Sequence, residues 1–216
     1  MARTREFDTD AAVEQAMQLF WCRGFEATSI QDLVEATGVQ RGSLYAAFGS
    51  KEGLYLAALD RYRQQLSRPL IDALRAGEPV RPLLRATLLS LVDAAVAANG
   101  TRCCLIVGAA LERLPVDTDV ATRVRDTVTA IEDALHDALA AAQQQGHLHT
   151  YHDPRALARF FVMTIQGLRV LGVVQPDRTT LTDAVDTALT TLDHIPVPHR
   201  PATTAARSHQ SASDAL

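Results

Sequence analysis

Apolar residues recur at intervals of three and four positions along most of the chain, a spacing that places side chains on one face of an α-helix. Aromatic residues make up only 5%, helix-forming residues dominate, and no β-rich alternating segment is found. The pattern therefore predicts an all-α protein of about nine helices. The expected helices span approximately residues 8–23, 28–37, 40–48, 50–75, 80–99, 101–114, 117–145, 154–174 and 179–193.

Residues 28–51 carry the most specific pattern in the chain. Two short helices are predicted, each with one buried apolar stripe. The residues of these stripes are Ile30, Leu33, Val34, Leu44 and Phe48. Gly38 lies between the helices, where the chain must reverse and glycine enters the left-handed backbone region without steric cost. This arrangement predicts a helix-turn-helix motif.

The second helix of this motif presents polar side chains at its front, where base edges and phosphates are contacted in helix-turn-helix proteins. Arg41 and Gln40 are the candidates for base contact, because bidentate Arg–guanine and Gln–adenine pairs are common. Ser43 can contact a base or a phosphate, and Gly42 allows the helix to lie close to the groove. Simple solvent exposure is the alternative for Arg41, Gln40 and Lys51, and for Gly42 the alternative is that the helix merely tolerates a glycine.

The formal net charge of −4 does not exclude DNA binding, because the interface alone must be positive. No acidic residue occurs from Ala36 to Lys51, whereas Arg41 and Lys51 fall inside this segment. A positive patch is therefore expected at the predicted helix-turn-helix motif.

The run T-S-I-x-D-L-x-x-x-x-G-V-x-x-G-S-L-Y-x-x-F-x-S-K-E resembles the N-terminal DNA-binding domain of the TetR family of bacterial transcriptional regulators, over roughly residues 10–60. The resemblance implies a repressor that a small-molecule inducer releases from its operator. It also implies phosphate contacts by Tyr45, Lys51 and Thr28. Many members carry histidine just before the phenylalanine, and the chain departs from them with Ala47.

The chain is expected to divide into a DNA-binding domain (1–63), a helical ligand-binding and dimerisation domain (64–195) and a disordered tail (196–216) rich in Pro, Ser, Thr, Ala and His. The helix 154–174 is apolar on two sides, and the last helix follows it directly. Two such helices suit a symmetric interface between identical chains, although a monomer that buries both remains an alternative. The predicted interface residues are Phe160, Phe161, Thr164, Leu168, Leu171, Leu181, Val185 and Leu189.

Three cysteines, Cys22, Cys103 and Cys104, fit a reduced cytoplasmic protein better than a disulfide framework. The run R-C-C-L-I-V-G-A-A-L-E resembles a segment in TetR-type regulators that sense electrophiles and oxidants, and Cys104 aligns best with the sensing cysteine. A predicted helix N-terminus and the neighbouring Arg102 both favour a thiolate there. The alternative is that Cys103 and Cys104 are small buried apolar residues.

No nucleophile–base pair, glycine-rich phosphate loop or metal motif stands out, and no cofactor is expected. The segment His147–Pro154 holds three histidines but is interpreted as a solvated loop rather than a metal site. No membrane span or signal peptide is predicted, so the expected location is the cytoplasm. The leading hypothesis is a homodimeric transcriptional repressor that binds a double-stranded operator and an unidentified small-molecule inducer. The alternatives are a constitutive DNA-binding protein without an inducer and a small helical enzyme.

Overall fold

The computed structural model describes residues 7–100 and 104–193, which form helices joined by turns and contain no strand. This confirms the predicted all-α class. The helices are α1 (Thr9–Arg23), α2 (Ile30–Thr37), α3 (Arg41–Phe48), α4 (Lys51–Tyr62), the π-helix η1 (Arg63–Ser67), α5 (Arg68–Arg75), α6 (Val80–Ala98), α7 (Leu105–Glu112), α8 (Thr118–Gln144), α9 (Pro154–Val174) and α10 (Arg178–Thr190). The predicted tail, 196–216, lies outside the described residues.

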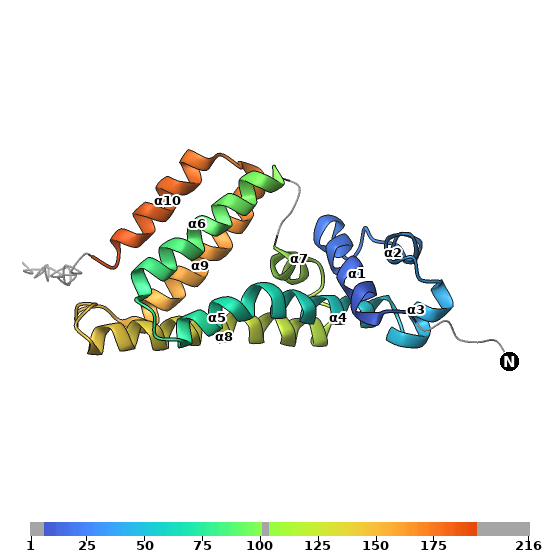
Figure 1. Cartoon of the computed structure of the whole chain (residues 1–216), viewed down its shortest axis with the longest axis horizontal. Coiled ribbons are helices and arrows are strands. Elements are labelled where there is room, and N and C mark those ends of the chain that lie inside the picture. The colour runs from blue at the N-terminus through green and yellow to red at the C-terminus, as the bar shows by residue number, and fades with distance from the viewer. Residues whose placement is uncertain (1–6, 101–103, 194–216) are drawn as a thin grey trace, which may run out of the picture.

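Helices α1 to α3 lie at one end of the molecule, where α1 and α3 pack on α4 and α2 packs on α1 and α3 (Figure 1). Ser29 begins α2 through a capping box, in which its hydroxyl accepts from the Asp32 N–H while the Asp32 carboxylate accepts from the Ser29 N–H. The Ser29 hydrogen bonds lower the pKa of the Asp32 carboxyl. Gly38 then ends α2 in the left-handed conformation at φ 67°, so the chain reverses into α3 as the sequence predicts.

The predicted helix 50–75 is a single rod that contains a π-helical segment. Helix α4 passes through η1 into α5, and the Arg68 N–H bonds to the carbonyl of Arg63, five residues earlier. Pro69 explains the irregularity, because it has no N–H to donate to the carbonyl of residue 65. Counting α4, η1 and α5 as one rod reduces the ten α-helices among the described residues to nine, the number that the sequence predicts.

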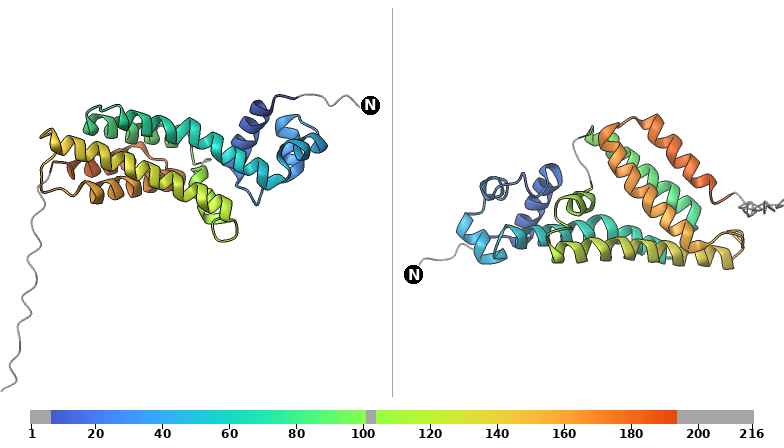
Figure 2. Two further views of the ribbon diagram at one scale, coloured as in Figure 1. Left: turned by 90° about the horizontal axis from the view of Figure 1, so that it is seen from below. Right: turned by 180° about the vertical axis from the view of Figure 1, so that it is seen from behind.

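The second part of the molecule is a helical bundle built on the α4–η1–α5 rod. Helix α8 runs along this rod, and α9 packs on α8, while α6 lies between α9 and α10 (Figures 1 and 2). Its core is a continuous apolar cluster that includes Leu84, Leu88 and Leu135. Gly172 allows the closest approach between α9 and α6, because a Cβ there would lie 2.6 Å from the Cβ of Ala95.

The apolar core of the N-terminal helices extends beyond them into α7 and the start of α8. Cys104, Ile106 and Ala109 are buried together with side chains of α1 and α4, as are Val120 and Val124 of α8. The predicted domain boundary at residue 63 coincides with the start of η1. Packing continues across this boundary, since α7 and the start of α8 share the core of the N-terminal helices.

Helix α9 requires a correction to the predicted dimer interface. Five of the named side chains are buried inside the chain itself, namely Phe161, Leu168, Leu181, Val185 and Leu189. The exposed apolar residues of α9 are Met163, Val170, Leu171 and Val174. Of the other predicted interface residues, Phe160 and Thr164 are half-buried, and Leu171 is at the surface. By length and composition α9 resembles a membrane-spanning helix, but its inner stripe packs in the bundle core.

Candidate nucleic-acid interface and internal cavity

The first turns of α3 carry an exposed polar face. Gln40 precedes the helix, Arg41 begins it, and both side chains are exposed, as are Gly42 and Tyr45. The Arg41 guanidinium lies over the Tyr45 ring at 5.4 Å and donates to its hydroxyl at 3.4 Å. Ser43 is half-buried. On the opposite face of α3, Leu44 is buried, so packing fixes which side of the helix faces outward.

Lys51 and Thr28 have different environments from this exposed face. Lys51 is half-buried at the first position of α4, and its Nζ lies 4.1 Å from the centre of the Phe25 ring. Thr28 is fully buried, and its hydroxyl donates to the Gly24 carbonyl at 2.7 Å. The expected phosphate contact by the Thr28 side chain is therefore corrected to a structural role in the turn before α2.

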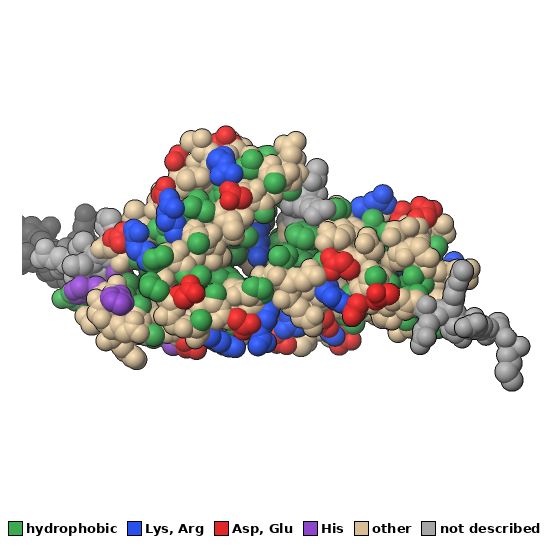
Figure 3. Space-filling view, viewed as in Figure 1, with side chains coloured by type: hydrophobic (Ala, Val, Ile, Leu, Met, Phe, Trp, Pro, Cys, Tyr) green, Lys and Arg blue, Asp and Glu red, His purple; other side chains and the backbone are tan. Residues whose placement is uncertain are grey.

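A half-open cavity of about 780 Å³ lies between the α4–η1–α5 rod and helices α6 and α9. Figure 3 shows a hollow bordered by hydrophobic side chains between the upper helices and the lower layer. The lining residues are mainly apolar, and Arg169 of α9 is the one charged side chain among those described. The volume lies within the usual range for small-molecule sites, roughly 300–1,000 Å³.

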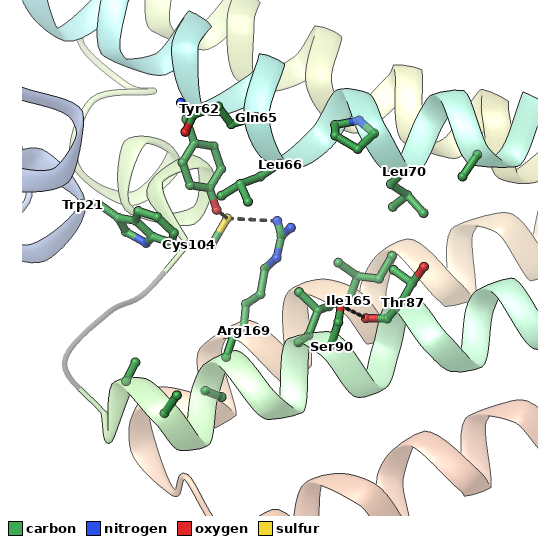
Figure 4. Close-up of a pocket in the computed structure, with 17 residues that line it drawn as sticks. Trp21, Tyr62, Gln65, Leu66, Leu70, Thr87, Ser90, Cys104, Ile165 and Arg169 are labelled. Carbon is green, nitrogen blue, oxygen red and sulfur yellow. Dashed lines mark hydrogen bonds between the residues drawn. The ribbon is translucent and has the colours of Figure 1, made fainter. Parts of the chain in front are cut away.

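Cys104 lies in the wall of the cavity as the N-cap of α7, where only 4% of its surface is exposed. Tyr62 of α4 donates its hydroxyl to the Cys104 Sγ at 3.3 Å, and Arg169 donates from Nη1 at 3.0 Å (Figure 4). Burial raises the pKa of the Tyr62 hydroxyl, so it remains a neutral donor. Trp21 borders the same region, with its ring edge-on to Tyr62 at 5.1 Å.

The sequence indicated Cys104 but neither of its two donors. Arg169 had a detectable signal, because it is the one charged residue in the apolar stretch from Phe160 to Val174. Tyr62 had none, because nothing local in the sequence indicates a partner 42 residues away. Cys103, the other sensing candidate, lies outside the described residues.

Helix α7 joins the cavity to the N-terminal helices. Its last residue, Glu112, accepts a hydrogen bond from the Phe25 N–H at 2.7 Å. The carboxylate reaches this amide because residue 24 is glycine: any Cβ there would overlap the Glu112 side chain, and φ is +80°. Thus one end of α7 contacts the N-terminal part of the chain through Phe25, and the other end carries Cys104.

Arg113, directly after α7, strengthens this connection. Its guanidinium lies 4.3 Å from the centre of the Phe25 ring and pairs with Glu26 at 3.1 Å and with Asp117 at 3.3 Å. The Phe25 ring therefore interacts with Arg113 and also with Lys51, the predicted phosphate contact.

The histidine-rich segment provides no metal site in the described part of the chain. Within residues 7–100 and 104–193, no group of three or more His, Cys, Asp or Glu side chains is arranged to hold a metal ion. His149 instead stacks on Tyr151 at 4.8 Å, and His152 is buried.

Comparison with known proteins identifies the family. The family model described as "Bacterial regulatory proteins, tetR family" matches residues 12–58. A second family model, described as "Tetracyclin repressor-like, C-terminal domain", matches residues 81–188. This chain belongs to the TetR family. It is a DNA-binding transcriptional regulator of that family and not an enzyme.

Individual TetR-family relatives cover most of the chain. It is 32% identical to an uncharacterized regulator, YezE of Bacillus subtilis, over 89% of this chain and 100% of the relative. It is 33% identical to the repressor ComR of Escherichia coli, over 78% of this chain and 80% of ComR. A cysteine mutant of the regulator CifR bound to 26-base-pair operator DNA has a TM-score of 0.78 and 32% identity, over 88% of this chain and 100% of that chain.

We expect Glu112→Ala to lower the free energy of unfolding of this TetR-family regulator by about 1–3 kcal/mol, because the Phe25 N–H loses its acceptor beside a buried side chain. Urea denaturation followed by circular dichroism measures the change. Glu35→Ala is the matched control, since Glu35 is exposed and bonds only within α2, to Gln31. Equal stability of the two variants would contradict the role assigned to Glu112.

Proposed function

We propose that this regulator is a homodimeric repressor of the cytoplasm that binds a pseudo-palindromic operator. A small molecule in the half-open cavity, or a thiol-reactive compound at Cys104, releases it. The observation that carries the proposal is the exposed polar face of α3, held outward by the burial of Leu44. Repressors among the relatives include ComR and BdcR of Escherichia coli, which supports repression as the direction of control.

The residues of this face are proposed to differ in their contacts with DNA. Arg41 and Gln40 contact base edges from the start of α3, and Gly42 allows the backbone to approach the groove. Tyr45 and Lys51 contact phosphates. Ser43 contacts either a base or a phosphate. Phosphate contacts position the protein, whereas base contacts select the sequence.

A second copy of the chain is the proposed occupant of the exposed apolar face of α9. One recognition helix contacts a half-site only, and two-fold related half-sites require two such helices. Met163 and Val174 are 65% and 75% exposed, and Phe160 and Gly167 continue the same stripe. An apolar strip of this kind on one helix suits a symmetric helical interface.

Release is proposed to pass through α7. A ligand or adduct beside Cys104 displaces the start of α7, and Glu112 carries the displacement to the Phe25 amide at its other end. Phe25 contacts Lys51 through its ring, so a phosphate contact of the operator complex is disturbed. Because α7 is buried in the same core as α1 and α4, it cannot move without them.

Operator variants separate the roles of Arg41 and Lys51. The operator is first identified by selecting bound DNA from random sequence. Arg41→Ala should then reduce the free energy of operator binding by about 1–3 kcal/mol and relax the sequence preference at one base position. Lys51→Ala should weaken binding to all sequences alike and reduce the magnitude of the salt slope by about 1. Fluorescence anisotropy against a panel of mutant operators measures both. Identical behaviour of the two variants would show that the roles are wrongly assigned.

Met163→Glu should convert the dimer to a monomer at micromolar concentration and weaken operator binding, because it places charge in an apolar interface. Analytical ultracentrifugation gives the mass. Leu111→Glu is the matched control, since Leu111 is 79% exposed at the end of α7 and outside the α9 face. A monomeric wild type with full operator affinity would refute the homodimer.

N-ethylmaleimide should release the wild type from its operator, while Cys104→Ser stays bound and Cys22→Ser responds like the wild type. Cys22 is the internal control because it is exposed, whereas Cys104 faces the cavity. DNA binding by the Ser variant is expected, since a cysteine mutant of CifR was solved with its operator. Gel-shift titration measures release. Equal release of the wild type and Cys104→Ser would exclude sensing by this thiol.

A further inference from the structure

Arg41 and Tyr45 form a side-chain pair on the exposed face of α3. Their four-residue spacing places them one turn apart on the same side of the helix. The Arg41 Cζ lies 5.4 Å from the centre of the Tyr45 ring, and the Arg41 Nη2 donates to the Tyr45 hydroxyl at 3.4 Å. The long arginine side chain is therefore held by both parts of the tyrosine, its ring and its hydroxyl.

No other side chain on this face competes for the Arg41 guanidinium. The remaining exposed residues of α3 are glycine or alanine, which have no polar side-chain atom. No acidic residue occurs from Ala36 to Lys51. Within residues 7–100 and 104–193, Tyr45 is the one side chain that bonds to Arg41 or stacks with it. The orientation of Arg41 on the protein surface thus depends on Tyr45.

A tyrosine is a suitable partner for an arginine that contacts DNA, because it orders the guanidinium without neutralising it. A carboxylate in the same place would offset the positive charge and would be repelled by the phosphates. Ordering a side chain with many rotamers is one of the costs of binding. When Tyr45 holds Arg41 before the DNA arrives, part of this cost is already met within the protein.

The Tyr45 hydroxyl can contact Arg41 and a phosphate at the same time. A phenolic hydroxyl has one proton to donate and lone pairs that accept. Because it accepts from the Arg41 Nη2, its proton is available for a phosphate oxygen. A phosphate contact through this hydroxyl therefore leaves its pair with Arg41 intact.

We propose that Tyr45 is a positioning residue for base recognition, and that its ring and hydroxyl hold the Arg41 guanidinium in the orientation that contacts a base edge. The inference deepens the proposed function and rests on base contact by Arg41. It gives Tyr45 a role beyond a phosphate contact. Loss of a phosphate contact weakens binding to all sequences alike, whereas loss of a positioning residue lowers discrimination at the one base pair that Arg41 contacts.

Discrimination is the ratio of affinities for the selected operator and for the same duplex changed at the base pair that Arg41→Ala identifies. Tyr45→Leu should lower this ratio by about 2- to 10-fold, because Arg41 must then be ordered on binding to the operator but not on binding to the changed duplex. Tyr45→Phe keeps the ring and should retain most of the discrimination, while it weakens binding to both duplexes by the same factor. Fluorescence anisotropy measures the affinities. Equal weakening of the two duplexes by Tyr45→Leu would overturn the inference.

The Arg41→Ala background tests whether Tyr45 acts through Arg41. In that background Tyr45 has no guanidinium to position, so Tyr45→Leu should not change the discrimination further. The same loss of discrimination in both backgrounds would count against the positioning role. Tyr151→Leu is the matched control, since Tyr151 is an exposed tyrosine before α9 that stacks on His149, and it should leave both affinities unchanged.

A measurement without DNA tests the positioning directly. NMR relaxation of the Arg41 Nε–H group, assigned by its loss in Arg41→Lys, reports the order of this side chain. Tyr45→Leu should increase its motion, and circular dichroism should show an intact fold, because Tyr45 lies at the surface. Unchanged order of the Arg41 side chain in Tyr45→Leu would contradict the positioning role.

The same binding data separate this inference from the proposed function. If Arg41→Ala relaxes the base preference and Tyr45→Leu leaves the discrimination intact, only the positioning role is refuted. If Arg41→Ala itself leaves the base preference unchanged, the base contact of the proposed function is wrong, and the positioning role is refuted with it.

Discussion

The hydrogen bond from the Phe25 amide to the Glu112 carboxylate is the contact on which the proposed communication between the cavity and the N-terminal helices depends. It is possible because residue 24 is glycine, which leaves room for the carboxylate and adopts a positive φ. The same short helix that ends at Glu112 begins beside Cys104 in the cavity wall. The proposed link between the cavity and the turn before α2 therefore runs through one eight-residue helix.

The other connections between the two parts reinforce this one. The α4–η1–α5 rod carries Lys51 at its start and lines the cavity with Tyr62, Leu66 and Leu70. Its π-helical segment lies beside the cavity, and such segments often occur at functional sites. Because α7 and the start of α8 are buried in the core of the N-terminal helices, the DNA-facing end is part of a continuous packing arrangement. In the proposed mechanism, a change in the cavity therefore reaches the N-terminal helices through packed side chains.

The sequence predicted the helices and the helix-turn-helix motif well, because caps, glycine turns and apolar spacing are local signals. Of the residues that it assigned to a dimer interface on α9, Phe161 and Leu168 are core residues, whereas Met163 and Val174, which it did not assign, are exposed. The sequence alone does not show which of two apolar stripes on one helix packs in the core, because this depends on where the neighbouring helices lie. Tyr62 and Arg169 were missed as donors to Cys104 for the same reason, since residues this far apart meet only in the folded chain.

Hydrogen exchange with and without a selected operator duplex tests most directly whether the DNA-facing end and the cavity are coupled. Coupling is reciprocal, so DNA binding must affect the segments through which the cavity acts. The account predicts altered exchange in residues 24–28 and in α7 (Leu105–Glu112), in addition to α2, α3 and the start of α4. Changes confined to α2–α4, with α7 and the Phe25 segment unaffected, would contradict it.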